Sequence, residues 1–131
     1  MATIKSYTDI SQSKKLAEIL PLESADMIWI LENPDLPAIK AIPYEDSDYN
    51  NKYLNIIPAW SLAALLEQLH YEVCDDDGYS TYLQMNKEDD VYQLVYADPY
   101  REFENIETNR YEHFVDACYE MILKLKELNL L

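Results

Sequence analysis

Glycine is almost absent from this chain, since only Gly78 occurs among its 131 residues. A single glycine excludes phosphate-cradling loops and dinucleotide-binding fingerprints, because both need several glycines where the backbone approaches the ligand. Basic residues are also scarce, with 10 Lys and Arg against 25 Asp and Glu and a formal net charge of −15. Phosphate backbones and anionic membranes are bound by Lys and Arg, so the charge disfavours both as direct ligands. The charge is compatible with a basic protein partner.

Long apolar runs are lacking as well. No run approaches the roughly 20 residues of a membrane span. The first segment, MATIKSYTDISQSKK, lacks the apolar centre of a signal peptide, so we expect a cytoplasmic protein without membrane contact. The only two cysteines, Cys74 and Cys118, are then expected to be reduced thiols rather than a disulfide.

The residues that are abundant indicate a folded chain. Hydrophobic residues make up 49% and charged residues 27%, which is close to the globular average. The length predicts a single globular domain over residues 1–131. Tyrosine occurs 12 times against two Phe, and its apolar ring with a polar tip suits half-buried positions and contact surfaces.

Three segments have the pattern of helices. Residues 8–20 are expected to start with Thr8 as N-cap and to end before Pro21. Residues 59–69, AWSLAALLEQL, predict a largely buried helix. In residues 112–130 apolar side chains recur at spacings of three and four residues, as on one face of a helix. Acidic residues lie near the N-terminal end and lysines near the C-terminal end, which is the order that the helix dipole favours. The members of this apolar stripe are Phe114, Val115, Cys118, Met121, Ile122, Leu125 and Leu128.

Extended segments lie between these helices. Residues 26–31, DMIWIL, predict a buried strand. Ile39 and Ile42 are assigned to a short edge strand, because Pro43 excludes a central one. The polar, Tyr-rich remainder of residues 38–58 is interpreted as a long surface loop ending with Pro58, just before the next helix.

A three-stranded meander is predicted over residues 71–97. Its first turn is expected at Asp77-Gly78, because this dipeptide between two β-like runs favours a type I′ hairpin. Its second turn is KEDD, residues 87–90. The last strand, VYQLVYA, alternates so that Tyr92, Leu94 and Tyr96 share one face, and we expect this tyrosine face to be the uncovered one. Residues 98–112 are interpreted as a loop or a poorly marked edge strand.

These elements together predict an α+β fold. We expect a small antiparallel sheet of three to five strands, including the meander at about 71–97, packed by about three helices. The terminal LNLL either continues the core stripe or docks a neighbouring subunit, so a monomer and a homodimer both stay open.

Three helical segments also carry a family resemblance. They are YTDISQSKKLAEILPLESADM (7–27), PAWSLAALLEQL (58–69) and VDACYEMILKLKELNLL (115–131). They resemble a group of short, acidic, uncharacterised proteins from gut bacteria and their prophages or mobile elements, and residues 38–57 and 71–112 match this group less clearly. The shared motifs are of packing type, so no site residue is implied. The resemblance implies a bacterial cytoplasm and a phage or integrated-element gene.

The acidic run Asp75, Asp76 and Asp77 is the first candidate for chemistry. Aligning Gly78 with position 6 of a calcium EF-loop puts Val73 at position 1 and Gln84 at position 12, so two essential oxygen ligands are missing. A catalytic carboxylate pair needs one member in an apolar pocket. A hairpin tip is solvated, so we interpret the run as a turn.

A zinc site and a nucleophile are the next candidates. The pairs His70–Cys74 and His113–Cys118 mix the two ligand types, whereas zinc sites usually pair Cys with Cys and His with His at short spacing. Cys118 lies on the apolar stripe, where burial disfavours reactivity. Ser61, Ser80 and Thr81 lack a G-x-S-x-G context. We therefore predict no catalytic, cofactor-binding or metal residue, and the enzyme question stays open with a leaning towards no.

The charge itself is the last candidate. Residues 72–112 contain twelve acidic and only three basic residues, a net charge of −9. We expect a non-catalytic interaction or accessory protein with an unknown protein partner, and a basic partner is one that the charge allows. The alternatives are an acidic DNA-mimic inhibitor of a nucleic-acid-binding protein and a small enzyme with an unrecognised carboxylate site. The twelve acidic residues in 72–112 are Glu72, Asp75, Asp76, Asp77, Glu88, Asp89, Asp90, Asp98, Glu102, Glu104, Glu107 and Glu112.

Overall fold

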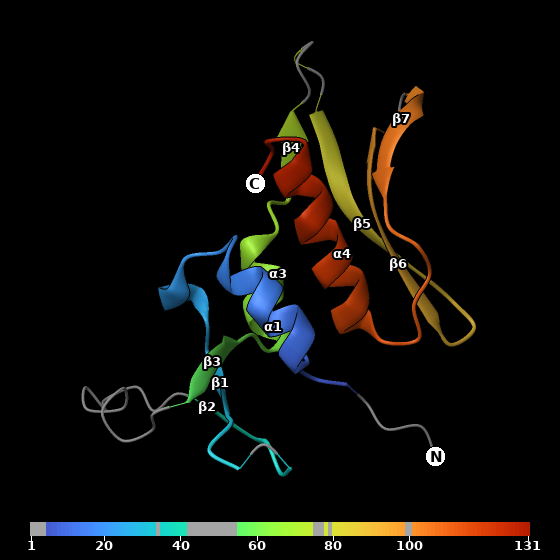
Figure 1. Cartoon of the computed structure of the whole chain (residues 1–131). Helices are drawn as coiled ribbons and strands as arrows, with labels where there is room; N and C mark the ends of the chain where they lie inside the picture. Colours follow the sequence, from blue (N-terminus) through green and yellow to red (C-terminus); the bar gives the residue numbers. More distant parts are fainter. Residues whose placement is uncertain (1–4, 34, 42–54, 75–77, 79, 99–100) are drawn as a thin grey trace. The chain divides into compact units, whose positions relative to one another are not determined.

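The structure is a computed structural model, and the α+β class is confirmed in it. The residues that it describes form two antiparallel sheets, α1 (Ile10–Ala17), α3 (Leu62–Gln68), α4 (Phe114–Glu127) and a 3₁₀ turn η1 (Leu22–Ser24) (Figure 1). The strands are divided between sheets of three and four strands, whereas a single sheet was expected. The described residues are 5–33, 35–41, 55–74, 78, 80–98 and 101–131, with the backbone alone at 101–105.

Contacts group the chain into two compact units, which we describe separately. One unit comprises Ser6–Ala64, and the other comprises Leu65–Leu131 together with Met1–Lys5. The boundary falls within α3. The prediction of a single domain over 1–131 stays a prediction.

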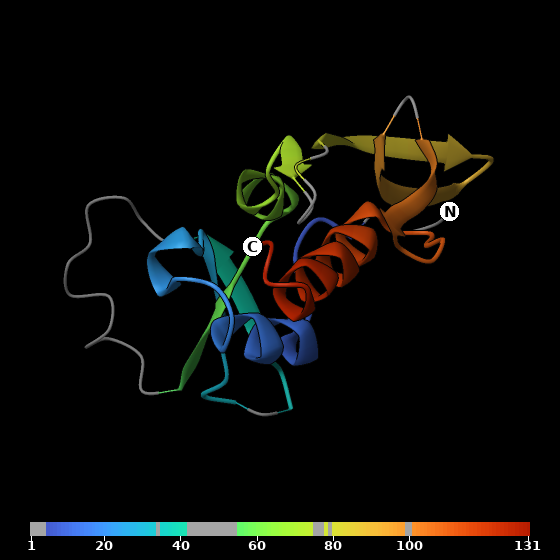
Figure 2. The same ribbon diagram turned by 90° about the horizontal axis from the view of Figure 1, so that it is seen from above.

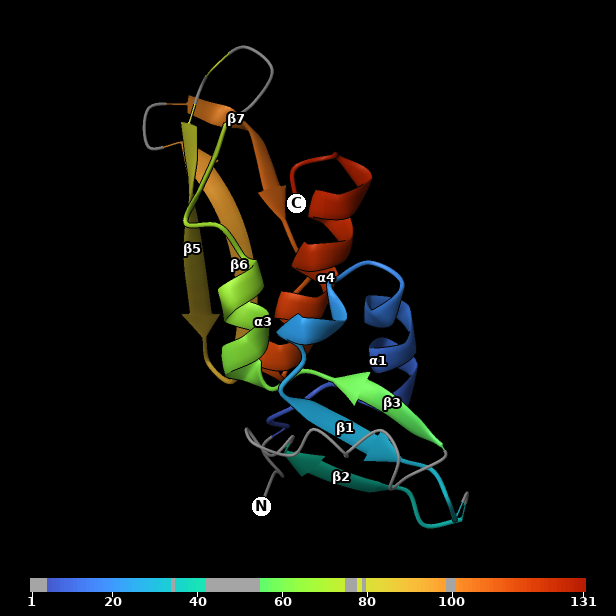
Figure 3. The same ribbon diagram turned by 90° about the vertical axis from the view of Figure 1, so that its left-hand side faces the viewer.

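The unit Ser6–Ala64 contains a three-stranded sheet with the order β2-β1-β3 (Figure 3). The central strand is β1 (Met27–Ile30), so the strand predicted at 26–31 is confirmed, with Ile28 and Ile30 buried and the other two residues half-buried. The edge strand β2 (Ala38–Ala41) confirms the prediction for Ile39, whereas Ile42 lies outside the described residues, as does most of the predicted loop.

The third strand of this sheet, β3 (Ile56–Ala59), corrects the sequence analysis. Pro58 was expected to precede a helix that starts at 59, but it lies within the strand opposite Ile28. A proline fits because β3 is an edge strand and pairs only with β1, so its missing N–H can fall on the unpaired side. Helix α3 consequently starts later, at Leu62.

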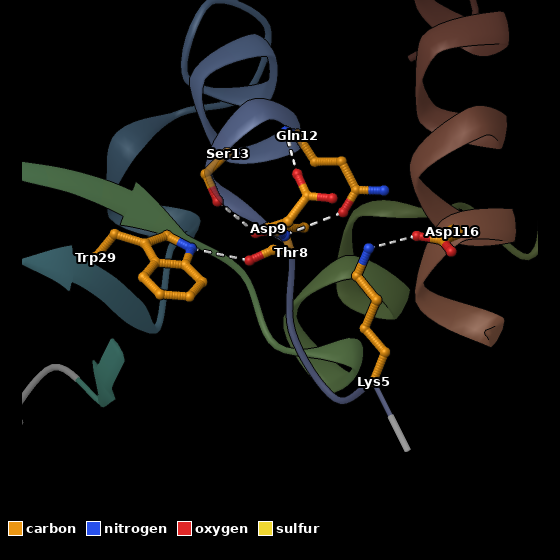
Figure 4. A network of polar contacts seen from close by, with 7 residues as sticks. All are labelled: Lys5, Thr8, Asp9, Gln12, Ser13, Trp29 and Asp116. Carbon is orange, nitrogen blue, oxygen red and sulfur yellow. Dashed lines mark hydrogen bonds and ion pairs between the residues drawn. The ribbon is translucent and has the colours of Figure 1, made fainter. Parts of the chain in front are cut away.

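Helix α1 begins with a capping box, and its cap also corrects the sequence analysis. The N-cap is Asp9 and not Thr8: the amide N of Gln12 donates to Asp9 Oδ1 at 2.8 Å, and the amide N of Asp9 donates to Gln12 Oε1 at 3.1 Å (Figure 4). Thr8 is buried, and its hydroxyl lies 2.7 Å from that of Ser13. The hydroxyl expected to cap the helix is therefore used inside the fold. The last helical residue is Ala17, four residues before Pro21.

Removing this cap should destabilise the protein measurably. We expect Asp9→Ala to lower the free energy of unfolding by about 1 kcal/mol, because the amide N of Gln12 loses its acceptor at an exposed helix end. Urea unfolding followed by circular dichroism measures this change. Asp9→Asn keeps the side-chain oxygen and serves as the control, and equal stability of the two variants would contradict the capping role.

The unit Leu65–Leu131 with Met1–Lys5 contains the predicted meander, extended by one strand in the order β4-β5-β6-β7. The segment 98–112 thus contains an edge strand, one of the two forms expected for it. The strands are β4 (Glu72–Cys74), β5 (Ser80–Glu88), β6 (Val91–Asp98) and β7 (Arg101–Glu107).

Two turns of this sheet were predicted from the sequence. Strands β5 and β6 close with Glu88 opposite Val91 around a two-residue turn, in which Asp89 has a positive φ of 54°. Strands β4 and β5 pair with Cys74 opposite Ser80. The predicted type I′ turn lies mostly outside the described residues, Asp77 included, but Gly78 is described and has the positive φ of 84° for which glycine is favoured.

Helix α4 confirms the prediction for residues 112–130 and covers one face of this sheet (Figure 2). The ring of Phe114 stacks on Tyr92 with centroids 5.5 Å apart, so the face carrying Tyr92, Leu94 and Tyr96 is the covered one. The expectation that the tyrosine face is uncovered is wrong. Strand β6 is apolar on both faces, and the larger side chains fill the space under the helix better.

The C-terminal end of α4 has a Schellman motif. Asn129 has a positive φ of 57°, its amide N donates to Lys126 O, and the amide N of Leu130 donates to Leu125 O at 2.8 Å. The chain turns away there, so Leu128, predicted on the core stripe, is 53% exposed. Leu130 stays half-buried beside the helix end. No helix in the described part of the chain has the length and apolar character to cross a membrane.

Candidate functional site

The face of strands β4–β6 that points away from α4 is the candidate site, and we call it the open sheet face. Residues directly opposite each other in antiparallel strands point to the same face, so the register assigns every member. Its β5 residues Gln84, Asn86 and Glu88 are exposed. The open sheet face consists of Glu72, Cys74, Ser80, Tyr82, Gln84, Asn86 and Glu88, with Val91, Gln93, Val95 and Ala97 of β6.

The two faces of β6 differ in how they are covered. Under α4, Leu94 is 1% exposed and Tyr96 is fully buried. On the open sheet face, Val91, Gln93 and Ala97 are half-buried, and only the central Val95 is buried. The middle of the open sheet face is therefore apolar, and amides and carboxylates surround it.

A hollow of about 480 Å³ lies at the end of the β5–β6 hairpin. Arg110 reaches it from the segment after β7 and forms an ion pair with Glu88, with the Nη1 and Oε2 atoms 3.4 Å apart. Both side chains are more than half exposed, so this pair adds little stability. The hollow is lined by Met85, Asn86, Lys87, Glu88, Val91, Gln93 and Arg110.

Polar contacts of the buried Thr108 fix the β6 side of this hollow. The Nε2 of Gln93 donates to Thr108 O at 2.9 Å. Thr108 is 3% exposed, and its Oγ1 accepts from the amide N of Leu94 at 3.0 Å while donating to Asn109 O. This threonine replaces a backbone acceptor where the β6–β7 ladder ends, and it holds Gln93 in a defined orientation on the open sheet face.

A second polar cluster lies at the β4 end of the open sheet face. Glu72, Cys74 and Ser80 are cross-strand neighbours, and the hydroxyl of Ser80 donates to the Glu72 carboxylate. The Cys74 sulfur lies 3.5 Å from Ser80 Oγ. The β pairing alone brings these groups together. No basic side chain accompanies them in these contacts, and an activated thiol needs an electropositive setting.

Titratable groups with shifted pKa values lie on the covered side of the sheet. Burial raises the pKa of Tyr96 to about 12, and its hydroxyl donates to His70 O at 2.6 Å. Burial also raises the pKa of the Cys118 thiol to about 12. A hydrogen bond with the Glu120 carboxylate is the main cause of the raised pKa of Tyr111. All three are protonated at neutral pH and act as structural groups.

The residues that the sequence suggested for metal binding are described only in part. Asp75, Asp76 and Asp77 lie outside the described residues. His113 is the N-cap residue of α4, and Cys118 is fully buried within that helix. Among the residues that the structure describes, no three His, Cys, Asp or Glu side chains are grouped as a metal site requires.

The candidate hydroxyls have structural partners. Ser61 binds the Asp26 carboxylate through its amide N at 2.8 Å, and its Oγ accepts from the amide N of Ala64 at the start of α3. Thr81 donates to Val73 O. The cysteines are both free thiols, as expected, with Cys74 exposed and Cys118 buried.

The two thiols should differ in reactivity. At about pH 8 only about one Cys118 thiol in ten thousand is ionised when its pKa is about 12. We expect one thiol per chain, Cys74, to react with a disulfide reagent in the folded protein and two in denaturant. Cys74→Ser should abolish the native reaction. Two thiols reacting at equal rates without denaturant would contradict the burial of Cys118.

Sequence reasoning missed the open sheet face itself. The alternation in VYQLVYA correctly divided the residues of β6 between the two faces of the sheet. Both faces are largely apolar, however, and the prediction chose the wrong face as the covered one. A weak signal lay in β5, where Gln84, Asn86 and Glu88 are polar at every second position. That period of two is typical of a strand with one solvated face.

The fold and the site together define an α+β protein with an open antiparallel sheet face of acidic character. No family model, curated protein or solved structure matches the chain.

Proposed function

We propose that this protein is a non-catalytic interaction or accessory protein that binds a protein partner through the open sheet face. One observation carries the proposal, namely the unequal cover of the four-stranded sheet. Within strand β6, Leu94 and Tyr96 are buried on the face under α4, whereas Val91, Gln93 and Ala97 are only half-buried on the other face. A half-covered strand surface with an apolar centre and a polar border resembles the anatomy of a protein interface.

The charge of the open sheet face indicates the partner's chemistry. Glu72 and Glu88 lie on it, and Glu107 joins them because it lies opposite Val95. Arg110 is the one basic side chain that pairs with these acids among the described contacts. With a net charge of −15 for the chain, a partner with a basic surface is favoured in encounter and in orientation.

The cellular setting is part of the proposal. The resemblance of the helical segments supports a bacterial cytoplasm and a prophage or mobile-element gene. The two alternatives, a DNA-mimic inhibitor and a small enzyme with a carboxylate site, have no comparable observation in their favour among the described residues.

A photo-crosslinking amino acid placed on the open sheet face tests the proposal. Benzoylphenylalanine replaces Tyr82 or Gln84, and the control position is Ser11, which is exposed on α1. We expect irradiation in the native host to link a different, basic protein from Tyr82 and Gln84 but not from Ser11. Equal products from all three positions, or only linked copies of this chain, would contradict the proposal.

Matched charge variants separate recognition from general acidity. Glu72→Gln with Glu107→Gln removes two negative charges from the open sheet face, and Glu23→Gln with Glu67→Gln removes two from exposed positions elsewhere. We expect the first pair to reduce the crosslinked product several-fold and the second pair to leave it unchanged. Equal losses would show that only the net charge matters.

A further inference from the structure

Strand β5 is longer than the strand that covers its outer edge. β5 has nine residues, whereas β4 has three and pairs only with Ser80–Tyr82. One further bond, from the amide N of Leu83 to Tyr71 O at 2.9 Å, ends this pairing. Over Gln84–Glu88 the side of β5 away from β6 has no strand partner among the described residues, and we call this stretch the free β5 edge.

The backbone groups on the free β5 edge can be assigned. The amide N of Leu83 points towards β4, and backbone groups alternate between the two sides of a strand. The N–H and C=O groups of Met85 and Lys87 therefore point to the free edge, and those of Gln84, Asn86 and Glu88 point to β6. An exposed edge of this kind is a template for another strand.

We propose that the free β5 edge pairs with the same edge of a second copy of this chain, antiparallel and centred on Asn86. In this register Met85 and Lys87 of one copy exchange backbone hydrogen bonds with Lys87 and Met85 of the other. Asn86 then faces Asn86 across the two-fold axis, and Gln84 faces Glu88. Each copy supplies the same surface, as a two-fold interface requires.

The side chains of this register are complementary. The amide of Gln84 can donate to the Glu88 carboxylate of the second copy, and the two Asn86 amides can bond to each other. Met85, which is 49% exposed, faces the aliphatic stem of Lys87 in the second copy. Each of the five positions thus meets a neutral or favourable neighbour.

The charge of the chain favours this edge over other contacts between copies. Two chains of −15 repel each other, but Gln84–Glu88 carries one positive and one negative residue and is locally neutral. A lysine at a strand edge often prevents such pairing. Here the Lys87 ammonium lies over its own Tyr92 ring, 5.3 Å from the ring centroid, so it is drawn away from the edge.

The resulting dimer has one continuous sheet, in which both open sheet faces lie on the same side. Five residues from each copy bury little surface, so we expect a weak dimer that forms with rising concentration. This inference does not rest on the proposed function, because crosslinking to a different protein at Tyr82 and self-association at Asn86 are measured separately.

Sedimentation velocity over micromolar to near-millimolar concentrations tests the dimer. The wild-type mass should rise from one chain towards two. Asn86→Asp and Asn86→Lys each place like charges at the two-fold axis and should weaken the dimer about fivefold or more. An equimolar mixture of these two variants should restore it. Ser11→Asp adds the same charge on α1 and should change nothing.

A backbone variant tests the edge itself. Met85→Pro removes an N–H that points to the free edge and spares the β5–β6 hydrogen bonds, so it should abolish the dimer while circular dichroism shows a folded chain. A wild-type protein that stays monomeric throughout overturns the inference. A dimer that persists in all the Asn86 variants and in folded Met85→Pro also overturns it.

Discussion

Trp60→Ala is expected to lower the free energy of unfolding by about 3 to 5 kcal/mol. Trp60 is fully buried in the unit Ser6–Ala64, between the end of β3 and the start of α3. Alanine would remove the whole indole ring and leave a cavity, since a close-packed interior relaxes only partly. The substitution also leaves the Ser24 hydroxyl without the indole N–H that donates to it at 2.9 Å.

The backbone at this position is equally constrained, which makes collapse of the cavity difficult. The amide N of Trp60 donates to Thr8 Oγ1 at 3.2 Å, and Trp60 O accepts from the amide N of Thr8 at 2.9 Å. Urea unfolding of the wild type and the variant measures the loss. Trp60→Phe keeps most of the volume and serves as the control with a smaller expected loss. A loss below about 1 kcal/mol for Trp60→Ala would contradict the burial of the ring.

Strong destabilisation at alkaline pH is the second large effect that we expect. Tyr96 and Cys118 have pKa values raised to about 12 by burial, from usual values of 10 and 9. A raised pKa in the folded state means that the protonated form is favoured there. The stabilisation is therefore complete below about pH 9 and is lost as the pH rises towards 12. The two groups together correspond to a loss on the order of 5 kcal/mol.

Urea unfolding at several pH values between 8 and 11 tests this expectation. The unfolding midpoint of each protein is compared with the midpoint of the same protein at neutral pH. Cys118→Ala removes one of the two groups, and Tyr96→Phe removes the other, so each variant should show a shallower decline than the wild type. Tyr96→Phe also loses the hydrogen bond to His70 O and should start from a lower stability. A pH-independent midpoint in the wild type would show that neither group is protected by the fold.

The sequence predicted elements well where one periodicity was long and unbroken. The apolar repeat from Phe114 to Leu125 identified α4, and the two β-like runs flanking residues 87–90 identified the β5–β6 hairpin. The early acids and late lysines of this helix also meet, since Glu120 and Lys124 form an ion pair with 3.8 Å between the charged atoms. These features depend on neighbours in the sequence, so local patterns contain enough information to place them.

The errors share a different physical origin. Strand β3 was missed because its apolar run continues into α3 and because Pro58 reads as a helix start, whereas its strand character comes from pairing with β1. The division into two sheets is likewise set by tertiary pairing. The covered face of β6 depends on how Phe114 packs on Tyr92, a contact across 22 positions of the sequence. Local patterns do not contain this information.

The candidate site was predictable only in part. The acidity of residues 72–112 and the absence of catalytic motifs followed from composition. The position of Glu72, Glu88 and Glu107 on one face required the strand register, and the orientation of Gln93 required the buried contact with Thr108. The hydroxyl of Thr108 bridges β6 and the end of β7, and no sequence rule anticipates such a substitute for a ladder hydrogen bond.

Carboxyl footprinting tests the central claim, that the open sheet face is the binding surface, most directly. The free protein and the complex recovered from the native host are labelled with a carbodiimide, and mass spectrometry reads each glutamate. We predict protection of Glu72, Glu88 and Glu107 in the complex and unchanged labelling of the exposed Glu18 and Glu23. Unchanged labelling of the first three, with protection only at Glu18 and Glu23, would contradict the account.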